Sequence, residues 1–189
     1  SKVIATTSAN VTFDGDNPTG AQLAAINDAA GGTITLNANG QAFTGTAAQM
    51  KSAFAGGLAG TQTGAVKISD TTGTIAATTL TDITAQTDGT VTAAAGGITI
   101  EGTTEEVTAA IVTGGTKAVM ANGAVRLTDT GTVAATVLSG IGGTTGGTVT
   151  VVGAMTITGS TEEITNALVT EASKVIATTS ANVTFDGDN

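Results

Sequence analysis

The sequence predicts an α/β repeat solenoid, in which stacked strand–strand–helix modules form a continuous sheet with flanking helices. Three observations lead to this prediction. A seventeen-residue segment occurs twice without a change, short Val- and Thr-rich segments recur at nearly constant spacing, and helix-start signals follow those segments. Each module is too short to bury its apolar face alone, so neighbouring modules are expected to stack on one another.

The composition favours strands and a thin core. The 189 residues include 42 Thr, 33 Ala and 27 Gly, whereas aromatic residues make up 2% of the chain. Small and β-branched side chains let flat layers approach closely, but they cannot fill a broad core. Hydrophobic residues make up 40%, which is too large a share for a disordered chain.

Charge and residue usage exclude several classes of protein. The net charge is −9 with six Lys and Arg, so the chain would repel a phosphate backbone and we expect no nucleic-acid partner. No apolar run approaches the roughly 18 residues of a membrane helix, so we expect no membrane span. The chain lacks Cys and His, which excludes disulfides and ordinary zinc sites and is consistent with a location outside the cell.

The internal repeat determines the organisation that we expect. Residues 1–17 read SKVIATTSANVTFDGDN, and residues 173–189 read the same, so the sequence returns to its start at Ser173. Two classes of strand segment alternate along the unit, the first starting at Asn10, Ala65, Ala124 and Asn182, and the second at Thr33, Thr90 and Thr148. This alternation predicts that 1–172 is one full unit of six modules, at approximately 1–32, 33–57, 58–89, 90–115, 116–147 and 148–172, with 173–189 beginning the next identical unit.

One helix is expected in each module. The second class has helices over 45–54, 102–111 and 159–168, each beginning with the S/T-x-x-E/Q pattern of a capping box, at Thr46/Gln49, Thr103/Glu106 and Ser160/Glu163. Their apolar pairs lie four residues apart, on one helix face, at Met50/Phe54, Val107/Ile111 and Ile164/Leu168. The first class has helices over 20–30, 75–85 and 133–141, with apolar pairs three apart at Leu23/Ile26, Leu80/Ile83 and Leu138/Ile141.

Strands are predicted where apolar residues alternate or run together. These segments cover 2–7, 10–14, 33–37, 65–69, 98–102, 124–128, 148–152 and 155–159. Two strands span about 9.6 Å and one packed helix about 10 Å, so a strand–strand–helix module could stack straight. Helices on opposite faces of the stack would relieve the same mismatch, and the sequence leaves both arrangements open.

The segments 98–111 and 155–168 resemble a known kind of repeat. They read ITIEGTTEEVTAAI and MTITGSTEEITNAL, and the pattern extends over the whole chain. It is similar to the repeats of giant bacterial cell-surface, adhesin-like proteins of the cyanobacterial or marine bacterial type. The resemblance implies an exported protein with a structural or adhesive role, and it implies no catalytic residues.

The acidic turns are the best candidates for a chemical site. Six aspartates occupy corresponding positions near the ends of first-class strands, namely Asp14, Asp16, Asp70, Asp129, Asp186 and Asp188. Carboxylates in turns can bind Ca²⁺, so calcium is the one cofactor that the sequence predicts. The EF-hand pattern is missing, because Ala25 stands eleven residues after Asp14. Asx turns and helix caps are the alternative interpretation.

Other polar groups favour structural roles over catalysis. Glu105, Glu106, Glu162 and Glu163 fall in first helical turns, where negative charge complements the helix dipole. The glycines form no phosphate-binding loop, and the chain has no His to activate a Ser or Thr hydroxyl. We therefore expect no enzyme activity.

The function that the sequence predicts is that of a non-catalytic structural repeat segment in an extracellular fibre, filament or surface layer. Its partner would be copies of itself, placed end to end. The alternative is the stalk or binding region of a large secreted bacterial adhesin, stabilised by calcium. Aromatic residues, the usual anchors of binding surfaces, are nearly absent, which favours a stalk over a binding head.

Overall fold

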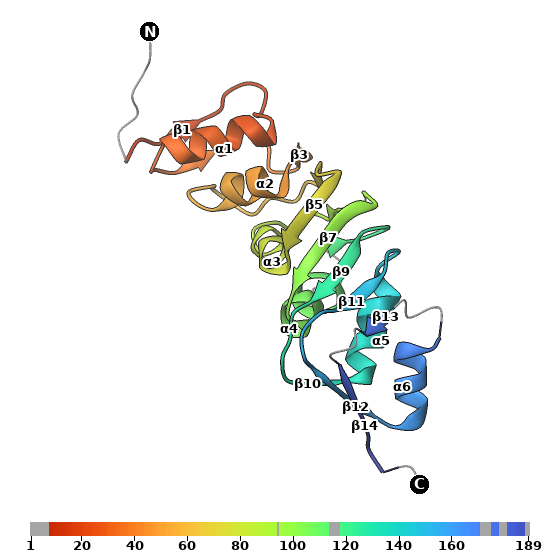
Figure 1. Ribbon diagram of the computed structural model, residues 1–189. Helices are drawn as coiled ribbons and strands as arrows, with labels where there is room; N and C mark the ends of the chain where they lie inside the picture. The colour runs from red at the N-terminus through yellow and green to blue at the C-terminus, as the bar shows by residue number, and fades with distance from the viewer. Residues whose placement is uncertain (1–7, 94, 114–117, 171–174, 178–180, 188–189) are drawn as a thin grey trace.

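The computed structural model describes residues 8–93, 95–113, 118–170, 175–177 and 181–187. It has an elongated shape, with β1 at one end and β14 at the other (Figure 1). The six described helices are α1 (Gly20–Ala29), α2 (Ala47–Phe54), α3 (Ala77–Thr84), α4 (Thr104–Val107), α5 (Ala135–Thr144) and α6 (Thr161–Leu168), and a π-helical turn η1 (Thr108–Val112) extends α4. Each of the six predicted module ranges contains one of these helices, while the division into modules stays a prediction.

The strands form four sheets, and every strand pair is parallel. The two-stranded sheet pairs β1 (Val11–Thr12) with β2 (Ile34–Thr35). The four-stranded sheet has the order β3 (Phe43–Gly45), β4 (Val66–Ile68), β6 (Val91–Thr92) and β8 (Ala118–Val119). The five-stranded sheet has the order β13 (Val175–Ala177), β11 (Val149–Val151), β9 (Ala124–Leu127), β7 (Gly97–Gly102) and β5 (Thr72–Ala76). The three-stranded sheet has the order β10 (Thr132–Ala134), β12 (Thr156–Gly159) and β14 (Asn182–Phe185).

The predicted repeat solenoid with one continuous sheet is wrong. The described residues form an α/β structure with four separate parallel sheets and six helices. Consecutive strands enter different sheets: β4 belongs to the four-stranded sheet, whereas β5, which follows it directly in the sequence, belongs to the five-stranded one. A strand therefore pairs with a strand from a neighbouring part of the sequence, and not with the other strand of its own module.

The physical reason is that strands and helices recur at different intervals. Across β7 and β9, Arg126 lies opposite Glu101 and bonds to it, 25 residues away. We call this distance along the sequence the pairing step, and the other strand pairs have steps of similar length. Successive helices are further apart on average, since they begin at Gly20, Ala47, Ala77, Thr104, Ala135 and Thr161. The predicted modules require strands and helices to recur at one common interval, and the two kinds of element do not.

This difference explains why the five-stranded and three-stranded sheets begin where they do. One pairing step before β5 leads to residues 47–51, which lie in α2. One step before β10 leads to residues 107–109, at the junction of α4 and η1. A helical segment cannot supply the extended backbone that the next strand pair needs, so a new sheet begins.

The core is thin and runs along the length of the fold. The predicted helix faces are confirmed: Met50, Val107, Leu80 and Leu138 are fully buried. On the sheet side, Ile100, Leu127 and Val151 are also fully buried. The rings of Phe43 and Phe54 meet edge to face, with centroids 5.7 Å apart. The core therefore consists of contacts between small groups of side chains, because this composition cannot fill a broad core.

The three predicted capping boxes are confirmed. The side chains of Thr46, Thr103 and Ser160 each accept a hydrogen bond from the backbone N–H three residues later, and the side chain there accepts one from the backbone N–H of the cap. The structure adds a fourth box at α1, formed by Thr19 and Gln22. α3 and α5 begin at alanines without a side-chain cap.

The strand predictions were correct wherever an apolar segment had been identified in the described part of the chain. The segments at 10–14, 33–37, 65–69, 98–102, 124–128, 148–152 and 155–159 each contain a strand, whereas β3, β5, β8 and β10 were missed. The predicted strand over 2–7 lies outside the described residues. In the part of the chain that the structure describes, no helix combines the length and hydropathy that crossing a membrane requires.

Leu138 and Val137 give a matched test of the core. Leu138 is fully buried in α5, while its neighbour Val137 is 37% exposed. We expect Leu138→Ala to lower the free energy of unfolding by about 2–5 kcal/mol, since it leaves a cavity. Val137→Ala should change it by less than about 0.5 kcal/mol. Denaturant unfolding followed by circular dichroism measures both values, and equal effects would contradict this description of the core.

Candidate functional site

Two of the predicted metal-binding aspartates bind the start of a helix instead of standing free. The Asp70 Oδ2 accepts a hydrogen bond from the backbone N–H of Ala47, with an N···O distance of 2.7 Å. The Asp129 carboxylate accepts from the backbone N–H and from the hydroxyl of Thr104, both at 2.8 Å. First-turn amides lack partners inside the helix and carry positive partial charge, so a carboxylate stabilises them. Each aspartate thereby links a turn to a helix that lies one pairing step earlier in the sequence.

Three of the other four predicted aspartates are exposed. Asp14, Asp16 and Asp186 are exposed, and Asp188 lies outside the described residues. Among the described residues, no group of three or more His, Cys, Asp or Glu side chains gathers in a way that could hold a metal ion. Calcium binding at the six aspartates stays a prediction.

In each glutamate pair, one carboxylate accepts a hydrogen bond at the helix cap and the other is exposed to solvent. Glu106 accepts from the Thr103 backbone N–H at 2.9 Å, and Glu163 accepts from the Ser160 backbone N–H at 2.8 Å. Their neighbours Glu105 and Glu162 are exposed. In each pair, one carboxylate is therefore engaged by the helix cap and its neighbour faces solvent.

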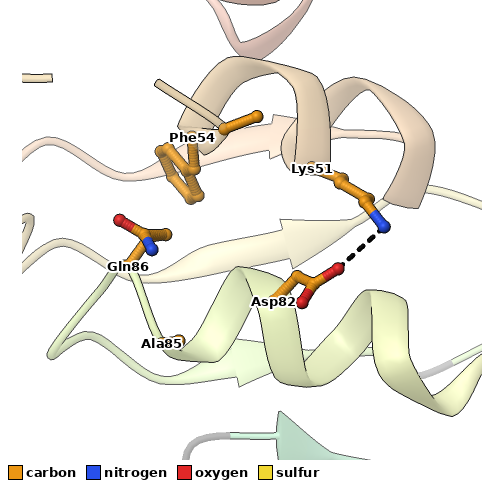
Figure 2. A pocket seen from close by; sticks show the side chains of 6 residues that line it. Lys51, Phe54, Asp82, Ala85 and Gln86 are labelled. Atoms are coloured by element: carbon orange, nitrogen blue, oxygen red, sulfur yellow. Dashed lines mark ion pairs between the residues drawn. The ribbon is translucent and has the colours of Figure 1, made fainter. Parts of the chain in front are cut away.

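A small pocket opens between α2 and α3 (Figure 2). It has a volume of about 230 Å³, and its lining includes Phe54 and Gln86. The Lys51 ammonium lies 2.7 Å from the Asp82 carboxylate across the pocket, and both side chains are about half exposed. An ion pair of this exposure contributes about 0–1 kcal/mol, and the pocket is smaller than typical ligand sites of roughly 300–1,000 Å³. The arrangement joins two neighbouring helices.

The duplicated segment contributes a strand at each end of the fold. Residues 10–13 and 182–185 have the same sequence, NVTF, and contain β1 and β14. In β1, Val11 lies opposite Ile34 of β2, which follows it in the sequence. In β14, Val183, the counterpart of Val11, lies opposite Ile157 of β12, which precedes it. The same strand sequence thus pairs along one edge in one copy and along the other edge in the second copy.

The two copies differ in how far they are covered. Phe13 packs against the core and lines a cavity of about 500 Å³ together with Pro18 and Ile26. Its counterpart Phe185 is 55% exposed. Of the six large apolar side chains that are exposed in the described residues, four lie after residue 168, namely Val169, Ile176, Val183 and Phe185. Exposed large apolar side chains are therefore concentrated in the described residues after Leu168, which we call the β14 end.

Neither a family model nor a curated protein nor a solved structure matches this chain. The resemblance to adhesin-like repeats stays a prediction.

Sequence reasoning missed the two features that join distant segments. The sequence indicated the carboxylate caps at Asp70 and Asp129 only as a general alternative to calcium, and it did not indicate the opposite pairing of the duplicated strand. Both follow from the pairing step that relates the strands. Asp70 lies 23 residues after Ala47, and Asp129 lies 25 residues after Thr104. That interval was the signal that could have found them.

Asp129 and Asp14 give a matched test of the carboxylate caps. We expect Asp129→Ala to lower the free energy of unfolding by about 0.5–2 kcal/mol, because the backbone N–H and the hydroxyl of Thr104 lose their acceptor. Asp14→Ala removes the same charge from an exposed turn and should change stability by less than about 0.5 kcal/mol. Denaturant unfolding in calcium-free buffer measures both. A loss of stability at Asp14 as large as that at Asp129 would contradict the capping role.

Proposed function

We propose that this chain is a non-catalytic structural segment of an extracellular fibre, filament or surface layer, in which copies of the chain lie end to end. The observation that carries the proposal is the opposite pairing of the duplicated strand. Its N-terminal copy pairs with the following strand β2, and its C-terminal copy pairs with the preceding strand β12. The two ends of the fold therefore offer complementary edges of one strand sequence.

The distribution of the core supports this proposal. Buried apolar residues occur from Leu23 to Val175, and the sheets and helices follow one another along an elongated body (Figure 1). An elongated body whose two ends carry complementary strand edges can lengthen by the addition of copies at those ends. Mechanical continuity then depends on backbone pairing at each junction.

The side chains support a load-carrying role over chemistry. The carboxylates of Asp70, Asp129, Glu106 and Glu163 all serve helix starts. The predicted location outside the cell rests on the lack of Cys and on the resemblance to exported repeat proteins. The net charge of −9 would keep parallel rods apart.

The axial repeat of the filament is the testable consequence. The unit 1–172 holds about seven pairing steps, and strands lie about 4.8 Å apart, which gives an axial repeat of roughly 34 Å. Purified chain at high concentration should form filaments with this repeat, measured by electron microscopy and fibre diffraction. Val137→Asp, on an exposed helix face, should leave the filaments intact. Compact, monodisperse particles at every concentration would contradict the proposal.

A further inference from the structure

We propose that β14 of one copy displaces β1 of a second copy and pairs with β2 of that second copy, in the register that β1 uses. This inference rests on the proposed function for the identity of the partner, a second copy of this chain, and it specifies the contact between copies. The reaction is an exchange of strands, with no covalent change.

The register follows from the two observed pairings. Val183 lies opposite Ile157 on one side, and its counterpart Val11 lies opposite Ile34 on the other. These pairings use different edges of the strand, so a single NVTF strand can satisfy both at once. In the exchanged pair, Val183 would lie between Ile157 of its own chain and Ile34 of the second copy. Thr184 would then lie opposite Thr35 of the second copy, where Thr12 lies in the unexchanged chain.

The number of paired positions indicates which strand leaves. β14 is paired with β12 at four positions, from Asn182 to Phe185, whereas β1 is paired with β2 at two, Val11 and Thr12. Backbone hydrogen bonds anchor both ends of β14, from the Asn182 N–H to the Met155 carbonyl and from the Asp186 N–H to the Gly159 carbonyl. β1 is also held by backbone bonds, from the Val11 N–H to the Thr33 carbonyl and from the Phe13 N–H to the Thr35 carbonyl, and the Asn10 Oδ1 accepts from the Thr33 N–H. Its shorter paired segment makes β1 the strand that leaves in this proposal, and its release opens the edge of β2.

The exposed side chains of the β14 end indicate what covers it. Phe185 and Val183 are 55% and 41% exposed, while their counterparts Phe13 and Val11 pack against the core beside α1. Residues 18–35 thus form a surface that already fits this strand sequence. The second copy carries that surface, and β14 would occupy it with the same side chains.

The exchange conserves strand pairs, because one NVTF strand gains the edge that the other loses. The contacts to β2 are the same before and after, since the sequences are identical. The net gain must come from further surface that the junction covers, for which the exposed Val169 and Ile176 are the candidates. Such an association is concentration-dependent, because it also has to offset the loss of translational freedom.

Disulfide trapping tests the register in the full chain, which has no Cys of its own. A Thr184→Cys chain is mixed with a Thr35→Cys chain and oxidised mildly, and cross-linked pairs are counted by non-reducing electrophoresis and intact mass. The matched control replaces Thr35→Cys by Thr33→Cys. That shift of two residues moves the thiol by about 6.6 Å, beyond the reach of a disulfide. We expect roughly tenfold less cross-linked product with Thr33→Cys; equal yields, or none in either mixture, would overturn the proposal.

The direction of exchange is tested by one substitution at two positions of identical sequence. Val183→Asp should raise the concentration for half-maximal assembly on the order of tenfold, because it places a charge on the invading strand. Val11→Asp should lower that concentration, because it loosens β1 from β2. Sedimentation of the full-length variants measures both. Effects of the same sign, or the reverse pattern, would overturn the proposed direction.

The two tests separate this inference from the proposed function. Filaments with the expected axial repeat but without the in-register cross-link would leave the fibre proposal standing and overturn the strand exchange. In-register cross-linked pairs that never lengthen into filaments would support the exchange and overturn the fibre.

Discussion

Parallel backbone pairing between segments one pairing step apart, as between Glu101 and Arg126, is the interaction on which the rest of this structure depends. All four sheets consist of such pairs, and the helices lie in the segments between them. The side chains are too small to form a broad core, and the backbone hydrogen bonds are alike in every register, so the buried apolar positions select the register. Ile100, Val125 and Val149 lie in line across three strands for this reason.

The helices obey a second constraint, which is local. Each predicted capping box depends on residues three apart, and the side chains of Thr46, Thr103 and Ser160 determine where their helices begin. Because helices recur at longer intervals than strand pairs, they shift relative to the sheets from one step to the next. The carboxylates of Asp70 and Asp129 join the two systems, since each accepts hydrogen bonds from a helix start one pairing step earlier.

The contrast between local helix signals and strand pairing over one pairing step explains how much could be predicted from the sequence. Helix positions, caps and buried faces such as Leu80/Ile83 were predictable, because they depend on neighbours within one or two turns. The partition into four sheets was not predictable. It depends on the small difference between the pairing step of the strands and the spacing of successive helices, and this difference adds up along the chain. The strands β3 and β5 were missed for the same reason: tertiary pairing, and not β-propensity, makes Gly45 and Gly73 part of a strand. The candidate site was half predictable: the duplication is visible in the sequence, but its opposite pairing is not.

The duplicated strand also explains how the edge of β14 can be specific for one pairing partner. Native edge strands are commonly protected by Lys, Pro or a bulge, and residues 182–185 carry neither Lys nor Pro in the sequence NVTF. An unprotected edge with Val183 and Phe185 exposed would pair with many strands if hydrogen bonding alone decided the outcome. Alternation restricts it, because a slip of one residue would turn both side chains to the opposite face. A partner must therefore offer an apolar surface in one register, and the surface around Ile34 and Pro18 already holds this sequence in that register. Specificity for a copy of the same chain then follows from the repeat itself.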